Sequence, residues 1–146
     1  MTGALLSVRP RFSRAILSGE KTVELRRRAP NCESGDVVIL YETAPTMAIV
    51  GIAVVDGIDK NSPARLWQRF KHSTGMTHSE FTEYFSGLTI ATAIYFRSTT
   101  VLRQPISLAE VRRIAPLFKP PQSWCYLAAL PAPLMSRIGR STGTIK

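Results

Sequence analysis

A charged strand is encoded by residues 18–28, SGEKTVELRRR, and its pattern decides how the surrounding elements are arranged. Side chains alternate between the two faces of a β-strand, so Val23 and Leu25 point to one side. The opposite face carries the polar and charged side chains of the segment: Thr22, Glu24, Arg26 and Arg28. We therefore expect one face of this strand to pack against a core and the other to be functional or solvated.

Before this strand, the sequence predicts a strand over residues 4–8 and a helix over residues 10–18. Pro10 falls in the first turn of that helix and Gly19 just past its end, which are positions these residues favour. One helix face is apolar at the spacing i, i+3 and i+4: Phe12, Ala15 and Ile16. The other face, with Arg11 and Arg14, is expected to point outward.

After the charged strand come three further β-rich runs: residues 37–43, 47–58 and 88–102. Gly51 predicts a bulge in the second run. Helix starts are marked by a Ser-Pro pair and two capping boxes: Ser62-Pro63, Thr77 to Glu80, and Ser107 to Glu110. The elements amount to five to six strands and three or four short helices without βαβ alternation, which predicts an α+β fold with a curved sheet or small barrel.

The chain has 146 residues, enough for a single domain with its own core, which we assign to residues 1–130. Residues 131–146 predict a short helical turn followed by a basic, flexible tail. No apolar run reaches the roughly 18 residues that would cross a bilayer, and the N-terminal residues do not resemble an export signal. We therefore expect a soluble, cytoplasmic protein that has no membrane partner.

The charge balance is strongly basic, with 19 Lys and Arg against 10 Asp and Glu. Seven of those 19 lie within residues 9–28, opposed there only by Glu20 and Glu24. Such a cluster favours a polyanionic partner, most commonly nucleic acid, and the alternative is a basic surface without a partner. Cys32 and Cys125 show no metal-ligand spacing and no cofactor-binding motif is present, so we expect neither metal nor cofactor.

Glu24 is the acidic residue best placed to form a site, because it shares a strand face with Arg26 and stands near Lys21. Its carboxylate either orients these two cations toward a phosphate or base edge, or forms an ion pair that closes a barrel edge. With Gly19, these residues form the pattern G-x-K-x-x-E-x-R after a helix that follows a first strand. The pattern resembles the signature of the ASCH domain (activating signal cointegrator homology), a branch of the PUA-like superfamily.

The resemblance covers residues 4–130 and includes four later segments: IVGIAVVDGI, SPARLW, GMTHSEFTEYFSG and FKPPQSWCYL. It implies a PUA-like β-barrel with short helices at its rim and a cleft that contains the motif and binds RNA. It also implies the label of transcriptional regulator or RNA-binding protein. Three functions fit: a nucleic-acid-binding module, most simply for RNA; a hydrolase of RNA or of a modified nucleoside; and a domain that binds a small anion or a protein.

The floor of that cleft is expected to consist of three residues: Lys21, Glu24 and Arg26. Its rim is expected to contact phosphates through basic side chains: Arg9, Arg11, Arg14 and Arg28. The opposite wall is expected from residues that follow a Pro pair and include aromatic rings able to stack on a base: Ser123, Trp124 and Tyr126. Trp124 fits equally well as a core residue.

The pattern favours a binding module over an enzyme, and catalysis would draw on four candidates: Lys21, Thr22, Glu24 and Tyr126. The resemblance includes one branch that acts as an amidohydrolase on N-acetylated cytidine, using a Lys, a Thr three residues later and a distant Glu. Here Lys21 is kept, but Glu24 occupies the Thr position and Thr74 stands near that of the distant Glu. We therefore expect no hydrolysis of N-acetylcytidine, unless Thr22 supplies the hydroxyl.

Overall fold

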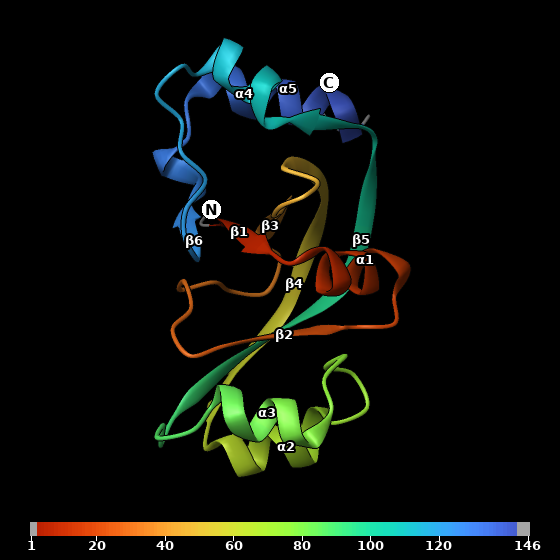
Figure 1. Cartoon of the computed structure of the whole chain (residues 1–146), viewed down its shortest axis with the longest axis vertical. Coiled ribbons are helices and arrows are strands. Elements are labelled where there is room, and N and C mark those ends of the chain that lie inside the picture. Colours follow the sequence, from red (N-terminus) through yellow and green to blue (C-terminus); the bar gives the residue numbers. More distant parts are fainter. Residues whose placement is uncertain (1–2, 143–146) are drawn as a thin grey trace.

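The computed structural model of the chain describes residues 3–142. Over these residues a six-stranded sheet in the order β2-β5-β4-β3-β1-β6 curls into a half-barrel (Figure 1). Its strands are, in chain order, β1 (Ala4–Val8), β2 (Val23–Arg26), β3 (Val37–Glu42), β4 (Ala48–Asn61), β5 (Ala91–Ser107) and β6 (Trp124–Tyr126). The predicted α+β fold with a curved sheet of five to six strands is confirmed.

The two longest strands, β4 and β5, pair antiparallel along most of their length. Their register shifts at three places: Ile49/Gly51, Val54/Val55 and Val55/Gly57. Such irregularities bend and twist a strand pair, which accounts for the curl of the sheet. The bulge predicted at Gly51 is confirmed, and a β-carbon at this position would lie only 2.8 Å from the carbonyl oxygen of Thr100.

Helix α1 (Pro10–Ser18) leads from β1 to β2 and ends as predicted at Gly19, whose φ of 88° lies in the left-handed region. Strands β1 and β3 are parallel neighbours, a pairing that the sequence pattern does not predict. Helix α1 and strand β2 therefore lie within the connection between two adjacent parallel strands. This route carries β2 to the far edge of the sheet.

Helices α2 (Pro63–Phe70) and α3 (His78–Tyr84) cover one end of the half-barrel, at the bottom of Figure 1. Ser62 caps α2, and Thr77 and Glu80 exchange hydrogen bonds in the predicted capping box of α3. The helices and β2 share one apolar cluster that includes Val23, Leu25, Leu66 and Phe81. Packing of this β2 face fixes the other face, with its charged residues, toward β1 and the segment before β6.

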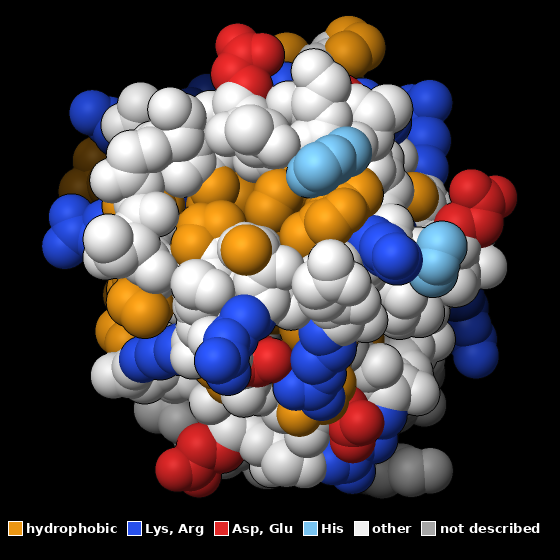
Figure 2. Space-filling model, turned by 90° about the horizontal axis from the view of Figure 1, so that it is seen from below, with side chains coloured by type: hydrophobic (Ala, Val, Ile, Leu, Met, Phe, Trp, Pro, Cys, Tyr) orange, Lys and Arg blue, Asp and Glu red, His pale blue; other side chains and the backbone are white. Residues whose placement is uncertain are grey.

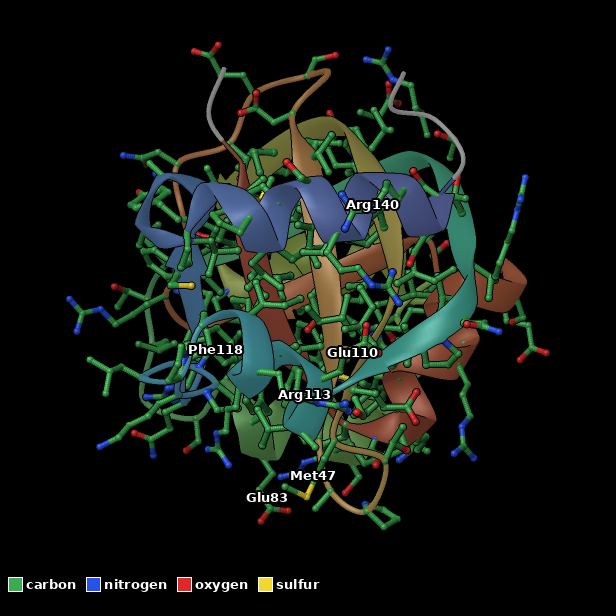
Figure 3. The ribbon with its side chains drawn as sticks, turned by 90° about the horizontal axis from the view of Figure 1, so that it is seen from above. Met47, Glu83, Glu110, Arg113, Phe118 and Arg140 are labelled. Atoms are coloured by element: carbon green, nitrogen blue, oxygen red, sulfur yellow. The ribbon has the colours of Figure 1, made fainter. Side chains whose placement is uncertain are left out.

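The opposite end of the half-barrel is covered by helices α4 (Leu108–Ile114) and α5 (Ala132–Thr142), and Figure 3 shows α5 lying across it. Leu134 and Ile138 of α5 are buried in the core, and Arg137 donates to Glu110 of α4 at 2.7 Å. The short helical turn predicted after residue 130 is therefore a longer, packed helix that runs through Thr142, which corrects the start of the predicted tail. Residues 143–146 of that predicted tail lie outside the described residues.

The face formed by α2 and α3 carries charges of both signs. Figure 2 shows Lys and Arg side chains next to Asp and Glu, below an apolar patch on this face. The net charge of +9 is therefore not spread here as a uniform positive surface. Within residues 3–142, no helix has both the length and the apolar character needed to cross a membrane.

Candidate functional site

A pocket of about 530 Å³ opens beside helix α1, strand β2, helix α3 and the segment that precedes β6. Six of the residues predicted for the site line this pocket: Arg9, Arg11, Lys21, Glu24, Arg26 and Ser123. They come from positions up to 114 residues apart in the chain. The fold thus brings together most of the cationic residues that the sequence assigned to one cleft.

Three buried charged side chains form the floor of this pocket, and we call them the floor trio: Lys21, Glu24 and Arg26. Glu24 Oε2 accepts a hydrogen bond from Arg26 Nε at 2.9 Å and lies 2.8 Å from its Nη2. Glu24 Oε1 lies 3.4 Å from Lys21 Nζ, which also donates to the carbonyl of Thr74. One buried carboxylate therefore forms ion pairs with two buried cations.

Arg26 also connects two edges of the curled sheet. From edge strand β2 its Nη2 donates to the carbonyl of Ser7 in β1 at 3.0 Å, and its Nη1 donates to Ser123 Oγ, just before β6, at 3.0 Å. A planar guanidinium with five N–H donors can make these bonds and the pair with Glu24 together. The predicted ion pair of Glu24 and Arg26 is present within β2, hydrogen bonds from the same arginine bridge the two edges, and both side chains also line the pocket.

Burial lowers the pKa of Lys21 from its ordinary value of 10.5. Attraction by Glu24 opposes this shift, whereas repulsion by Arg26 adds to it. The Lys21 ammonium also lies 5.0 Å from the centre of the Phe12 ring, a favourable cation–π distance. Because a lowered pKa eases proton exchange, Lys21 is the member of the floor trio best suited to give or take a proton.

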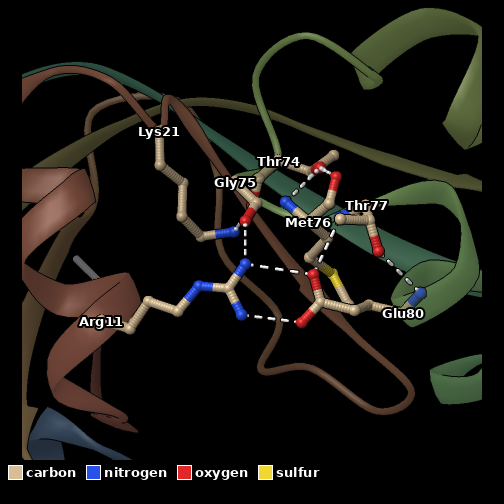
Figure 4. A network of polar contacts seen from close by, with 7 residues as sticks. All are labelled: Arg11, Lys21, Thr74, Gly75, Met76, Thr77 and Glu80. Atoms are coloured by element: carbon tan, nitrogen blue, oxygen red, sulfur yellow. Dashed lines mark hydrogen bonds and ion pairs between the residues drawn. The ribbon is translucent and has the colours of Figure 1, made fainter.

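The rim of the pocket contains a second charged cluster, the rim pair, formed by Arg11 of α1 and Glu80 of α3 (Figure 4). Arg11 donates through Nη1 and Nη2 to the two carboxylate oxygens at 2.7 and 3.0 Å. The bond from Arg11 and the backbone bond from Thr77 hold the pKa of Glu80 at about 2. Arg11, predicted as a phosphate contact, is thus already engaged by a carboxylate of the protein.

The loop of residues 73–77 links the floor trio to the rim pair (Figure 4). The carbonyl of Thr74 accepts a hydrogen bond from Lys21, and the carbonyl of Gly75 accepts one from Arg11 at 2.9 Å. Gly75 has a φ of 70°, which favours glycine, and a β-carbon there would lie 3.4 Å from Lys21 Cδ. Thr74 therefore lies beside Lys21, but it meets the ammonium with a backbone oxygen.

Two predicted rim residues lie outside this pocket. Arg14 is exposed, and its Nη2 lies 3.4 Å from the buried carboxylate of Glu42. Strand β2 ends at Arg26, so Arg28 leaves the strand that was predicted to contain it and lines a second hollow together with Trp124. The predicted common face of Arg26 and Arg28 is corrected, because the chain bends after β2.

The two remaining catalytic candidates do not line the pocket either. Thr22 is exposed and precedes β2, and its backbone N–H donates to the carbonyl of Ser73 at 3.1 Å. The hydroxyl of Tyr126 accepts a hydrogen bond from the backbone N–H of Asn31 at 3.1 Å. Their assignment as catalytic residues stays a prediction, and their positions give it no geometric support.

Several lining residues are absent from the sequence-based site: Ser7, Glu80, Glu83, Tyr84 and Gln122. Glu80 has a local signal as part of a capping box, but its partner Arg11 is 69 residues away. Tyr84, at the end of α3, is 39% exposed. Within residues 3–142, no group of three or more His, Cys, Asp and Glu side chains is arranged to hold a metal ion.

The curled half-barrel with its covering helices is an α+β fold, and a charged pocket lies beside β2. Comparison with known proteins identifies the family. The family model of the ASCH domain matches residues 6–100. An ASCH domain-containing ribonuclease from Zymomonas mobilis subsp. mobilis is 35% identical over 124 residues, which cover 85% of this chain and 83% of the relative. The chain belongs to the ASCH domain family, as the resemblance of its motif implies.

Solved structures agree with this assignment. A crystal structure of a single-residue variant of the Zymomonas mobilis ASCH protein has a TM-score of 0.87 at 30% identity, covering 96% of this chain and 98% of the other. Human THYN1, solved in complex with DNA containing 5-methylcytosine, has a TM-score of 0.57 at 10% identity, covering 94% and 95%. The first match confirms the PUA-like fold that the resemblance implies, and the second is a likeness of fold alone.

Proposed function

We propose that this protein binds RNA in the pocket above the floor trio and cleaves its phosphodiester bonds there. The observation that carries the proposal is the excess of buried positive charge, since Lys21 and Arg26 share the single carboxylate of Glu24. A buried cation in excess is costly unless an anion compensates it. A phosphate bound in the pocket would provide that anion.

The surroundings of the floor trio support a polyanionic ligand. Arg9 lines the pocket and is exposed, and within residues 3–142 its side chain makes no hydrogen bond or ion pair. Net charge of +9 favours the approach of nucleic acid. The match to a relative named as a ribonuclease over 85% of the chain supports cleavage in addition to binding.

Cleavage of RNA proceeds by attack of a 2′-hydroxyl on the adjacent phosphorus while the bond to the 5′-oxygen breaks. The reaction needs a proton acceptor, a proton donor and stabilisation of the negative charge on the phosphoryl oxygens. We assign the fixed charge to Arg26, whose fork is held by Glu24. We assign both proton transfers to Lys21, whose pKa is lowered and which lines the pocket: its neutral amine takes the proton of the 2′-hydroxyl and then returns it to the leaving 5′-oxygen. Glu24 then orients both cations without contacting RNA.

The proposal is tested with fluorescently labelled RNA and a Lys21→Met variant, which removes the amine and leaves Glu24 paired with Arg26. Cleavage followed on denaturing gels should fall by roughly 10²- to 10⁴-fold. Arg113→Ala is the control, because this exposed arginine belongs to α4, which lies at the opposite end of the half-barrel from α3 (Figure 1).

Equal cleavage by wild type and a folded Lys21→Met variant would show that the pocket is not the active site. Binding without cleavage by wild type would restrict the function to a binding module. Absence of both would overturn the proposal. The same preparations should leave N-acetylcytidine intact, because neither Glu24 nor the exposed Thr22 presents a hydroxyl to the pocket.

A further inference from the structure

A second hollow of about 470 Å³ adjoins the pocket of the floor trio. It is lined by Arg27, Arg28, Tyr84, Ser123 and Trp124. Tyr84 and Ser123 line both cavities, so they stand at the boundary between them. An extended ligand could pass between these two residues and occupy both hollows.

The walls of the second hollow combine aromatic rings with arginines. Trp124 is half-buried in β6 and lies edge-on to Tyr126, with ring centres 5.0 Å apart. Tyr84, the last residue of α3, lies edge-on to Phe85 at 4.6 Å. These neighbours hold both rings in place while Tyr84 stays 39% exposed, which leaves aromatic surface available to a ligand.

The two arginines have different roles in this hollow. Arg27 is tied to the end of α3, because its Nη1 donates to the carbonyl of Tyr84 at 2.8 Å. Arg28 is exposed, and among residues 3–142 its side chain has no hydrogen bond or ion pair. Arg27 therefore shapes the wall, whereas Arg28 is free to contact an anion.

We infer that the second hollow is a nucleotide subsite, which takes the nucleotide next to the reacting phosphate. Its base would stack on Trp124 or Tyr84, and Arg28 would contact its phosphate. This inference rests on the proposed function, since it requires RNA in the first pocket. It predicts that a dinucleotide is the smallest ligand that binds tightly, with one nucleotide in the pocket of the floor trio and one in the second hollow.

The test measures binding of 2′-O-methyl oligouridines of one to four nucleotides, which lack the attacking hydroxyl. Wild-type affinity should rise at least roughly tenfold from one nucleotide to two, because one base–aromatic stack is added. Trp124→Leu and Arg28→Ala should each reduce that step while leaving the affinity for uridine monophosphate unchanged. Matched controls are Trp67→Leu, on α2 where it stacks on His78, and Arg113→Ala on α4.

The inference would be overturned if wild type bound one and two nucleotides with equal affinity. It would also be overturned if the gain in affinity from one nucleotide to two were the same in both variants as in wild type. If either result came with RNA cleavage that still depends on Lys21, the proposed function would stand without the second subsite. If no oligouridine bound and no RNA was cut, the proposed function and the inference would fail together. Retained folding of each variant is checked by circular dichroism and urea unfolding.

Discussion

The floor trio and the rim pair are two charged clusters that border one pocket, yet they differ in burial and in balance. In the floor trio two cations share one carboxylate, and all three side chains are less than 10% exposed. In the rim pair one cation meets one carboxylate, and the Arg11 side chain is 57% exposed. The shortest N–O distances are almost equal, 2.8 Å in the trio and 2.7 Å in the pair.

The difference teaches that distance alone does not decide what an ion pair does. An exposed, balanced pair is screened by water and salt, and its main effect is to position α1 against α3. The buried trio is unbalanced, so it contributes little net stability and leaves a net positive charge at the pocket floor. Substitutions at the rim should therefore have small effects on stability, whereas substitutions at the floor should have large effects on stability or on function.

The largest expected effect follows from Glu24→Gln, which keeps the shape of the side chain and removes its charge. Lys21 and Arg26 would then be two buried cations without a carboxylate between them. Removing one partner of a buried pair costs about 3–5 kcal/mol, so the free energy of unfolding should fall by that amount. Urea unfolding measures it.

Glu110→Gln is the matched control, because Glu110 also pairs with an arginine, Arg137, but is one-third exposed. Glu110→Gln should lower the free energy of unfolding clearly less than Glu24→Gln does. If both substitutions cost the same, burial would not distinguish the trio from other ion pairs, and the comparison would be wrong.

A smaller effect on stability is expected from Lys21→Met. The variant leaves a balanced pair of Glu24 and Arg26, so its stability at neutral pH should lie within about 1 kcal/mol of wild type or above it. Burial lowers the pKa of Lys21 in the folded state, so in the window below 10.5 the unfolded chain binds more protons. The stability of wild type should therefore rise with pH across this window, relative to Lys21→Met.

The difference in stability between wild type and Lys21→Met at each pH reports the titration of Lys21 alone, because all other groups titrate in both proteins. Burial raises the pKa of Cys32 to about 11, for example, and that contribution is lost in both proteins as pH rises from 9. Urea midpoints taken from neutral to alkaline pH provide the measurement. Parallel curves for wild type and Lys21→Met would show that Lys21 is not desolvated in the folded state.

Much of the fold and the whole floor trio were predictable from local patterns. Alternation along residues 22–26 placed Glu24 and Arg26 on one face, and the short separation from Lys21 kept the third charge nearby. Helix ends were predicted equally well, because Gly19 and the Thr77 capping box act through bonds within a few residues. Such signals depend only on neighbours in the chain.

The rim pair and the second hollow were not predictable, because they depend on residues far apart in sequence. Arg11 meets Glu80 across 69 residues, and Arg28 and Trp124 lie 96 positions apart in the chain. Helix α5 is a different case, since Leu134 and Ile138 have the i, i+4 spacing of an apolar helix face. This apolar pattern is short, and the surrounding residues are basic and include glycines, which is typical of a flexible tail. The sequence therefore predicts only a short helical turn.

The salt dependence of RNA binding should distinguish arginines that have no carboxylate partner in the protein from arginines that form an ion pair. Arg9 and Arg28 make no ion pair within residues 3–142, whereas Arg11 contacts Glu80 and Arg14 contacts Glu42. Each lost phosphate contact flattens the slope of log K against log salt by about 0.7 for a single strand. Arg9→Ala with Arg28→Ala should flatten it by one to two units, and Arg11→Ala with Arg14→Ala by less. The reverse order would show that RNA displaces the carboxylates at the rim.

The smallest expected effect concerns the rim pair in acid. The pKa of Glu80 is lowered from 4.5 to about 2 in the folded protein, chiefly by Arg11 and then by Thr77. Stability from this shift is present above pH 4.5 and is lost as pH falls toward 2, where the folded carboxylate takes up its proton. Arg11→Ala should therefore lower the urea midpoint slightly at neutral pH, and the two curves should converge in acid or in about 1 M salt, where exposed pairs are screened. An offset that stays constant across pH and salt would assign the effect to packing of the Arg11 side chain on Phe12 rather than to its charge.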